Sequence, residues 1–175
     1  MPTSAPASRT APSFPPGSLT VGLIKSEAIR NGHVDAIVSL LLKEVTRKFD
    51  DGQADKSAAS LAIIPLKLTR EQATAFYSDH IGKPYFEGLI ESVTGDSGVV
   101  AILLSGDNVI ERWRKLMGPT DPVVARQIAP DTIRALYATA MPHTAVHGAG
   151  TDEEAARQFA VLQEIPEMAH FIKQP

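Results

Sequence analysis

The chain of 175 residues contains no cysteine. This absence excludes disulfides, thiolate catalysis and cysteine-based zinc sites, and it leaves the redox compartment open. Long apolar runs are also missing, so no segment has the length of a membrane-spanning helix. The net charge of −3 provides no general attraction for nucleic acid or for an acidic membrane. The sequence therefore predicts that neither a nucleic acid nor a membrane is a partner.

Several familiar ligand-binding motifs are absent as well. The sequence has no GxGxxG or Walker A glycine-rich phosphate loop, no HExxH motif and no EF-hand loop. We therefore expect no dedicated metal site made of protein ligands. A Mg²⁺ ion that arrives bound to nucleotide phosphates needs few protein ligands, and it remains compatible with this sequence.

The composition that is present is typical of one globular domain with a core, because hydrophobic residues make up 43% and charged residues 21%. Residues 1–18 are rich in proline and serine and predict an N-terminal arm, which is a candidate contact for a homo-oligomer or a larger protein assembly. The folded domain is expected over 19–165. A loosely packed C-terminal tail is expected after Gln163, with 166–175 outside the domain.

Hydrophobic periodicity predicts strands and helices that alternate irregularly along the chain. The expected strands cover 19–25, 61–68 and 98–104. Pro65 favours an edge position for the second of them. The expected helices cover 34–49, 69–80, 86–93, 107–117 and 151–162, with a short turn after Asp131.

Two parts of the chain are harder to assign. The segment 121–130 reads as irregular, and the insertion 50–60 reads as a polar loop. A fourth strand should complete the sheet, and the candidates are 161–165 and 138–141. The pattern favours an α+β fold, a ferredoxin-like antiparallel four-stranded sheet with helices on its faces.

His147 lies in a glycine-flanked segment, which we read as a loop, just before a predicted helix start at Thr151. Thr151 and Glu154 have the spacing of a capping box, and the amides of such a helix start attract anions. Histidine can act as a nucleophile and form a covalent intermediate. A loop histidine without a chemical role is the alternative interpretation.

Three cations stand at the ends of predicted elements: Lys25 after the first strand, Arg114 on the helix before Gly118, and Arg134 after Asp131. Each of them alone is typical of a solvated surface charge. Together with His147 they would form a phosphate pocket, since guanidinium groups match phosphate oxygens.

An ordered series of short motifs resembles the nucleoside diphosphate kinase family from about Leu19 to Glu164. The matching pieces, in the order of the family, are Leu23-Ile24-Lys25, Gly82-Lys83-Pro84-Tyr85-Phe86, Gly98-Val99-Val100-Ala101, Gly118-Pro119-Thr120-Asp121-Pro122, Pro130-Asp131-Thr132-Ile133-Arg134 and Ala145-Val146-His147-Gly148. Single pieces are weak signals, whereas the series is specific.

The resemblance implies a ferredoxin-like core and ping-pong transfer of the terminal phosphate from nucleoside triphosphates to nucleoside diphosphates. His147 would be the phosphorylated catalytic residue, with Tyr77 and Gln158 supporting it and Mg²⁺ travelling with the nucleotide. The remaining implied positions bind the phosphates, the sugar or the base: Lys25, Arg114, Thr120, Arg134, Thr144, Tyr85 and Met141.

The sequence departs from the family around the histidine. Thr144 replaces an asparagine, Ala149-Gly150 replaces Ser-Asp, and Gln158 replaces the glutamate that orients the ring. Near Lys25, Ser26-Glu27 replaces Pro-Asp. A glutamine accepts a hydrogen bond but brings no negative charge, so we expect weakened activity.

The segment between Thr120 and Arg134 is longer than in the common hexameric enzymes and resembles a divergent branch with mitochondrial and cilium-associated members. The resemblance therefore leaves the location open between the cytoplasm, a cilium or axoneme, and a mitochondrion. Two functions follow as expectations. One is a phosphotransferase with reduced activity, and the other is a structural or nucleotide-sensing module of a ciliary, axonemal or mitochondrial assembly with little or no catalysis.

Overall fold

A computed structural model describes residues 17–46 and 60–172 of the chain. Nearly all of the expected N-terminal arm, the insertion after Asp50 up to residue 59, and the last three residues lie outside these ranges.

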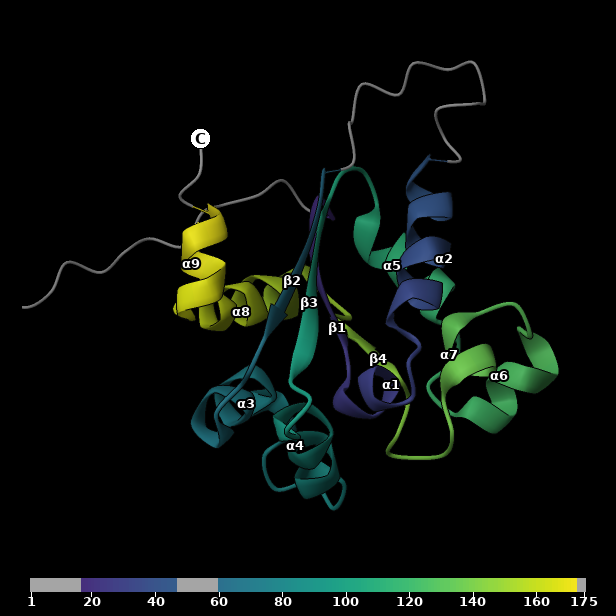
Figure 1. Ribbon diagram of the computed structural model, residues 1–175, viewed down its shortest axis with the longest axis horizontal. Coiled ribbons are helices and arrows are strands. Elements are labelled where there is room, and N and C mark those ends of the chain that lie inside the picture. Colours follow the sequence, from purple (N-terminus) through teal and green to yellow (C-terminus); the bar gives the residue numbers. More distant parts are fainter. Residues whose placement is uncertain (1–16, 47–59, 173–175) are drawn as a thin grey trace, which may run out of the picture.

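Four antiparallel strands form one sheet in the order β2-β3-β1-β4 (Figure 1). The strands are β1 (Leu19–Ile24), β2 (Ser60–Leu66), β3 (Val99–Ser105) and β4 (Val146–Gly148). The central pair, β1 and β3, is largely buried, as the continuous apolar runs in both segments require. Pro65 lies on an edge strand, where a missing amide hydrogen does the least damage. The predicted ferredoxin-like α+β sheet is confirmed.

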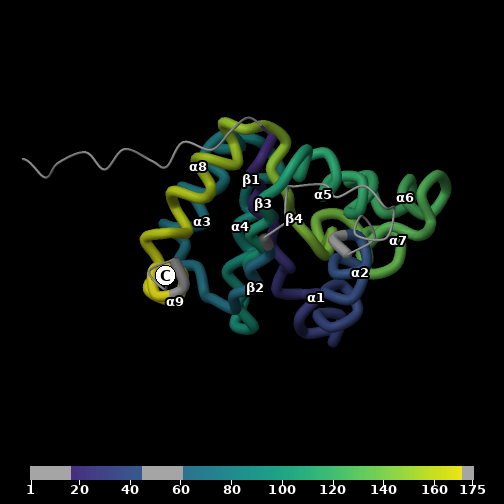
Figure 2. The backbone as a smooth tube through the Cα atoms, turned by 90° about the horizontal axis from the view of Figure 1, so that it is seen from above, coloured from purple at the N-terminus to yellow at the C-terminus, as the bar shows by residue number. Residues whose placement is uncertain are grey.

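Helices cover both faces of this sheet (Figures 1 and 2). One apolar cluster lies between the sheet and the helices α3 (Arg70–Phe76), α4 (Phe86–Thr94), α8 (Asp152–Leu162) and α9 (Pro166–Ile172). The cluster on the other face involves α1 (Ser26–Arg30), α2 (Val34–Thr46), α5 (Val109–Met117) and α7 (Ile133–Tyr137). The helix α6 (Pro122–Ile128) packs against α7, and the short 3-10 helix η2 (Ser78–His80) follows α3.

The fourth strand is not one of the two segments expected from the sequence. Residues 161–165 belong to the end of α8 and the turn after it, and 138–141 contribute only an isolated bridge at Ala140. The strand is β4, which carries His147, so this residue lies on a strand and not in a loop. A strand of three residues is too short to show an alternating pattern.

The irregular segment expected over 121–130 is also wrong, because most of it forms α6. The Asp121 side chain accepts a hydrogen bond from the Val123 amide at 2.8 Å, and Pro122 occupies the first turn. Both are favourable at a helix start. The helix expected from residue 107 begins instead at Val109, and the residue before it, Asn108, has a φ of 52° in the left-handed region.

The loosely packed tail expected after Gln163 is wrong for its described part. The helix α9 packs against β2, and both Ile165 and Met168 are buried in the apolar cluster on that face. A helix of seven residues has few turns, so its apolar residues repeat too few times to predict this packing.

A pair of glycines lets α5 lie close to the two strands that position the site. Gly22 of β1 pairs with Gly148 of β4, and the Trp113 ring lies over both. A methyl group on Gly22 would lie 2.8 Å from Trp113 Nε1, and one on Gly148 would lie 2.5 Å from the same atom. The Trp113 Nε1–H donates to the His147 carbonyl at 3.2 Å, so the close approach also anchors β4.

We predict that Gly22→Ala lowers the free energy of unfolding by about 1–3 kcal/mol, because the new methyl group overpacks the Trp113 ring. Urea unfolding of the single variant, of Trp113→Phe and of the double variant forms a double-mutant cycle. The smaller ring should relieve part of the cost of the alanine. Strictly additive effects would show that the ring is not the cause.

Candidate functional site

His147 is the central side chain of the candidate site. It lies in the middle of β4, where it pairs with Leu23 of β1. Its ring makes edge contacts with the rings of Phe76 and Tyr77, and each pair of ring centroids is 5.1 Å apart. The sheet therefore holds the backbone of His147, while the aromatic rings beside α3 restrict its imidazole.

One imidazole nitrogen is occupied and the other is free. His147 Nε2 lies 3.0 Å from the Gln158 Oε1 on α8, and the fully buried Gln158 stands behind the ring. An amide oxygen only accepts hydrogen bonds, so the neutral ring carries its proton on Nε2. Nδ1 keeps its lone pair and has no hydrogen-bond partner among the described residues.

The surroundings keep this imidazole neutral. Burial lowers the pKa of His147 from 6.5 to about 3, the positive charges of Lys25 and Arg134 lower it further, and the Gln158 hydrogen bond opposes them. A neutral imidazole is the nucleophilic form, so at neutral pH His147 needs no base to remove a proton from Nδ1.

Lys25 reaches the site from the junction of β1 and α1. Its Nζ donates to the Thr144 Oγ1 at 3.0 Å, and its side chain is almost completely buried. Burial lowers the pKa of Lys25 to about 8, with the nearby Glu27 carboxylate raising it and Arg134 lowering it. A buried ammonium group with one neutral partner favours binding an anion, which would restore the lost solvation.

Glu27 connects α1 to the segment that carries the histidine. The buried Glu27 Oε1 accepts from the Ala145 amide at 2.8 Å, and the Lys25 amide donates to the Ala145 carbonyl at 2.8 Å. Ala145 has a φ of 63°, which costs about 1–3 kcal/mol for a residue other than glycine. These two bonds hold the turn that directs Thr144 and His147 into the site.

Two arginines complete the positive side of the site. Arg134 is largely buried, and its guanidinium donates to the Gly118 carbonyl at 2.9 Å and to the Val146 carbonyl at 3.2 Å, while its Nε lacks a partner. Burial lowers the pKa of Arg134 to about 10. Arg114 is exposed and donates to the Gly150 carbonyl at 3.4 Å. Arg134 is therefore fixed, whereas Arg114 remains accessible to a ligand.

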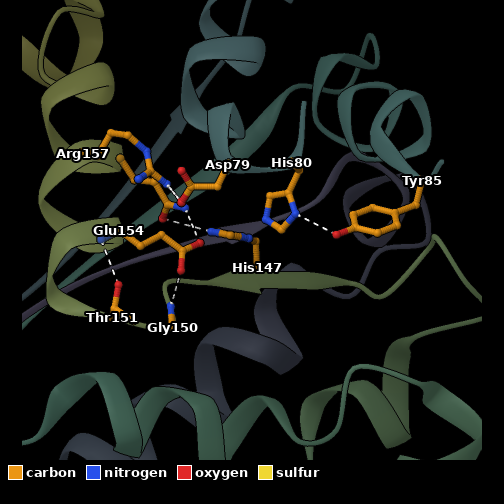
Figure 3. Close-up of polar contacts among 9 residues, drawn as sticks. Asp79, His80, Tyr85, His147, Gly150, Thr151, Glu154 and Arg157 are labelled. Carbon is orange, nitrogen blue, oxygen red and sulfur yellow. Dashed lines mark hydrogen bonds and ion pairs between the residues drawn. The ribbon is translucent and has the colours of Figure 1, made fainter. Parts of the chain in front are cut away.

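A cleft of about 420 Å³ opens above the histidine ring. Tyr85 and Met141 are about half exposed at its lining, and the Tyr85 hydroxyl lies 3.1 Å from the His80 Nδ1 (Figure 3). A larger cleft of about 890 Å³ adjoins it and shares Arg114 and Arg134, but His147 is not in its lining. Of these two clefts, the smaller one is the candidate site, because His147 lies only in its lining.

The structure brings the residues singled out from the sequence together. The residues of this set that line the smaller cleft are Lys25, Tyr77, Tyr85, Arg114, Thr120, Arg134, Met141, Thr144 and His147. Gln158, the remaining member, lies behind the histidine and contacts it directly.

Glu154 was predicted only as part of a capping box, and its side chain does something else. Thr151 Oγ1 accepts from the Glu154 amide at 3.1 Å, as expected. The carboxylate, however, accepts from the Gly150 amide at 2.7 Å and from the Gln158 Nε2 at 2.9 Å. Its position four residues before Gln158, on the same face of α8, was the signal available in the sequence.

The described part of the chain contains no group of three or more acidic or histidine side chains arranged to hold a metal ion. None of its helices combines the length and the apolar character needed to cross a membrane.

Comparison with known proteins agrees with this geometry. The family model of nucleoside diphosphate kinase matches residues 18–166. A nucleoside diphosphate kinase of Legionella pneumophila (strain Paris) is 35% identical over 153 residues, which are 87% of this chain and 96% of the relative. The solved nucleoside diphosphate kinase of Halobacterium salinarum in complex with CDP superimposes with a TM-score of 0.64 at 28% identity and covers 85% of this chain and 89% of its own.

A Thioredoxin domain-containing protein 3 homolog from Ciona intestinalis is also similar, with 35% identity over 143 residues. These residues are 80% of this chain, but the chain spans only about a fifth (20%) of the length of that relative. The fold, the site and these similarities together define a ferredoxin-like phosphotransferase scaffold. More specifically, the chain belongs to the nucleoside diphosphate kinase family.

We predict that His147 makes the stability of the protein depend on pH. Between pH 6.5 and about 3 the unfolded chain binds a proton at this residue that the folded protein does not bind. The free energy of unfolding should therefore fall as the pH decreases through this window. Urea unfolding at pH values between about 4 and 7 should show a smaller slope for His147→Asn than for the wild type. The exposed neighbour provides a matched control in His143→Asn, and equal slopes for all three proteins would contradict the prediction.

Proposed function

We propose that this protein is a nucleoside diphosphate kinase, which moves the terminal phosphate of a nucleoside triphosphate to a nucleoside diphosphate through phosphorylated His147. The observation that carries the proposal is the state of this residue. Its imidazole is neutral, its Nε2 is held by Gln158, and its Nδ1 is free beside a cleft that contains Lys25, Arg114 and Arg134.

The first half of the reaction needs no proton transfer. The lone pair of His147 Nδ1 attacks the terminal phosphorus, and an N–P bond forms. The bond from phosphorus to the bridging oxygen breaks, and the oxygen keeps the electron pair and leaves with the diphosphate. The ring becomes positive with its proton still on Nε2, where the Gln158 oxygen accepts it.

The second half reverses these steps. A terminal oxygen of a second nucleoside diphosphate attacks the phosphorus, the N–P bond breaks and its electron pair returns to Nδ1. Because the transferred group passes through a loose transition state, positioning and electrostatics provide most of the catalysis. Lys25 and Arg134 are held by hydrogen bonds before any ligand arrives, so little reorganisation is needed.

The cleft also accommodates the other parts of a nucleotide. Tyr85 and Met141 offer exposed apolar surface to a base, and His80 holds the Tyr85 hydroxyl. Thr120 and Lys25 provide polar groups for the sugar or the phosphates. The side chains around the phosphate position are mainly cations and offer Mg²⁺ few oxygen ligands. Mg²⁺ would therefore enter bound to the phosphates.

A second candidate function is that of a structural or nucleotide-sensing module. The observation that favours it is Gln158, which holds His147 with a neutral amide where a carboxylate would stabilise the positive ring. Similarity to one part of a much longer relative is consistent with use of this fold as a module. A nucleotide-sensing module requires nucleotide binding without a phosphorylated intermediate, whereas a structural module requires neither.

We predict that labelled ATP yields a phosphoprotein that is labile in acid and stable in base, and that nucleoside diphosphate removes the label. His147→Asn should abolish labelling, because no nucleophilic nitrogen remains at that position. The nearby exposed His143 provides the matched control, and His143→Asn should label like the wild type. An unlabelled wild type that still binds nucleotide would favour the second candidate.

We also predict that nucleotide affinity depends on the charge of Lys25. As the pH rises through about 8, Lys25 loses its proton, and affinity should fall by an amount approaching about tenfold per pH unit above the pKa. Calorimetric titration in two buffers with different ionisation enthalpies should show proton uptake on binding near this pH. Lys25→Arg keeps its charge throughout and should lack this dependence; an equal dependence in both proteins would assign the effect to another group.

A further inference from the structure

Gln158 contacts His147 where the resemblance to the family implies a glutamate, and the Glu154 carboxylate in turn contacts Gln158. We propose that Glu154 is a positioning residue that selects the reactive tautomer of His147 by fixing the orientation of the Gln158 amide. This inference rests on the proposed function for its catalytic consequence, but the tautomer itself can be observed without nucleotide.

The orientation of a glutamine amide must be decided by its partners, because its oxygen and nitrogen ends have the same shape. Gln158 is completely buried and has His147 on one side and Glu154 on the other. The histidine cannot decide the orientation, since a neutral imidazole either donates or accepts at Nε2, depending on its tautomer. Glu154 therefore fixes the orientation of the Gln158 amide.

Glu154 is suited to this role because both of its oxygens accept hydrogen bonds. Oε2 accepts from the Gly150 amide at 2.7 Å, and Oε1 accepts from the Gln158 Nε2 at 2.9 Å. Figure 3 shows Glu154 reaching from α8 to the Gly150 backbone and to the neighbourhood of the His147 ring. An ionised carboxylate has no hydrogen to donate, so the NH₂ end of Gln158 must face it.

The consequence for the histidine follows directly. With its NH₂ end facing Glu154, Gln158 presents its oxygen to His147 Nε2 at 3.0 Å, and the ring places its proton there. A rotated amide would present NH₂ to the ring, which would then accept at Nε2 and carry the proton on Nδ1. That tautomer has no lone pair on Nδ1, so it could not attack phosphorus from this position.

Glu154 itself is held at a defined distance from the ring. It lies in the first turn of α8, which begins at the Thr151 cap, and the Gly150 amide fixes its second oxygen. The hydrogen bonds thus run from the Gly150 backbone through Glu154 and Gln158 to His147. The negative charge that is missing at position 158 is present one amide away.

The test uses the full chain and reads the tautomer by nitrogen NMR of the histidine ring without nucleotide. The wild type should carry the ring proton on Nε2 of His147. The glutamine in Glu154→Gln has a single oxygen, which the Gly150 amide should hold, so its NH₂ end faces position 158. The Gln158 amide should then rotate, and the Nδ1-protonated form should appear. The hydrogen bond lost is one to a charged group, so the tautomer ratio and the rate of phosphohistidine formation should change by about 10- to 100-fold.

A swapped variant separates this role from simple support of the loop. Glu154→Gln combined with Gln158→Glu has the same residue at position 154 as the single variant, and it places a carboxylate, which only accepts, against the ring. The Nε2 proton and the rate of phosphorylation should recover to within about tenfold of the wild type. Gln158→Glu alone should not raise the rate, because two carboxylates would then face each other.

Glu153→Gln is the matched control, since it removes an exposed carboxylate from the same helical turn and should change neither readout. A wild type with the proton on Nδ1, an unchanged tautomer in Glu154→Gln, or a swapped variant as impaired as Glu154→Gln would overturn the proposal. The expected tautomers together with no phosphohistidine in the wild type would support the positioning role and would instead refute the proposed kinase activity.

Discussion

The pairing of the short strand β4 with β1 is the constraint on which the site depends. It places His147 opposite Leu23. One side of the sheet faces α5, and the other side faces α3 and α8. Gly22 and Gly148 leave room for the Trp113 ring, which in turn anchors the His147 carbonyl. The strand pairing and the Trp113 hydrogen bond thereby both hold the backbone that carries the His147 side chain.

The positive and the negative side chains around this strand make different contacts. The cations Lys25, Arg114 and Arg134 line the cleft, where a phosphate would meet them. The carboxylates of Glu27 and Glu154 bind backbone amides and the amide of Gln158. The cations therefore remain available for a ligand, while Glu27 and Glu154 hold the segments around His147 in place. This division matches phosphoryl transfer, in which the protein contributes positioning and positive charge.

Sequence reasoning predicted the long periodic elements, because a buried strand such as β1 or an amphipathic helix such as α2 repeats its pattern several times. It failed at β4, which is too short to repeat, and at α6, whose start at Asp121-Pro122 was taken for a loop. His147 and the three cations were found from their positions near the ends of predicted elements, and the other residues of the cleft through the resemblance to a family. Glu154 was not, since spacing shows that it shares a helix face with Gln158 but not that its side chain turns toward Gly150.

The amide between the Glu154 carboxylate and the histidine has a consequence for the energy stored in the intermediate. A ring phosphorylated on Nδ1 with its proton on Nε2 would be positive, and the carboxylate on its Nε2 side stands one residue further away than in a direct carboxylate–histidine pair. Under the proposed function, the phosphoprotein would then be less stable relative to the free protein, and its phosphate would be given up more readily. Under the proposed function, this difference would favour delivery of the phosphate over loading of His147.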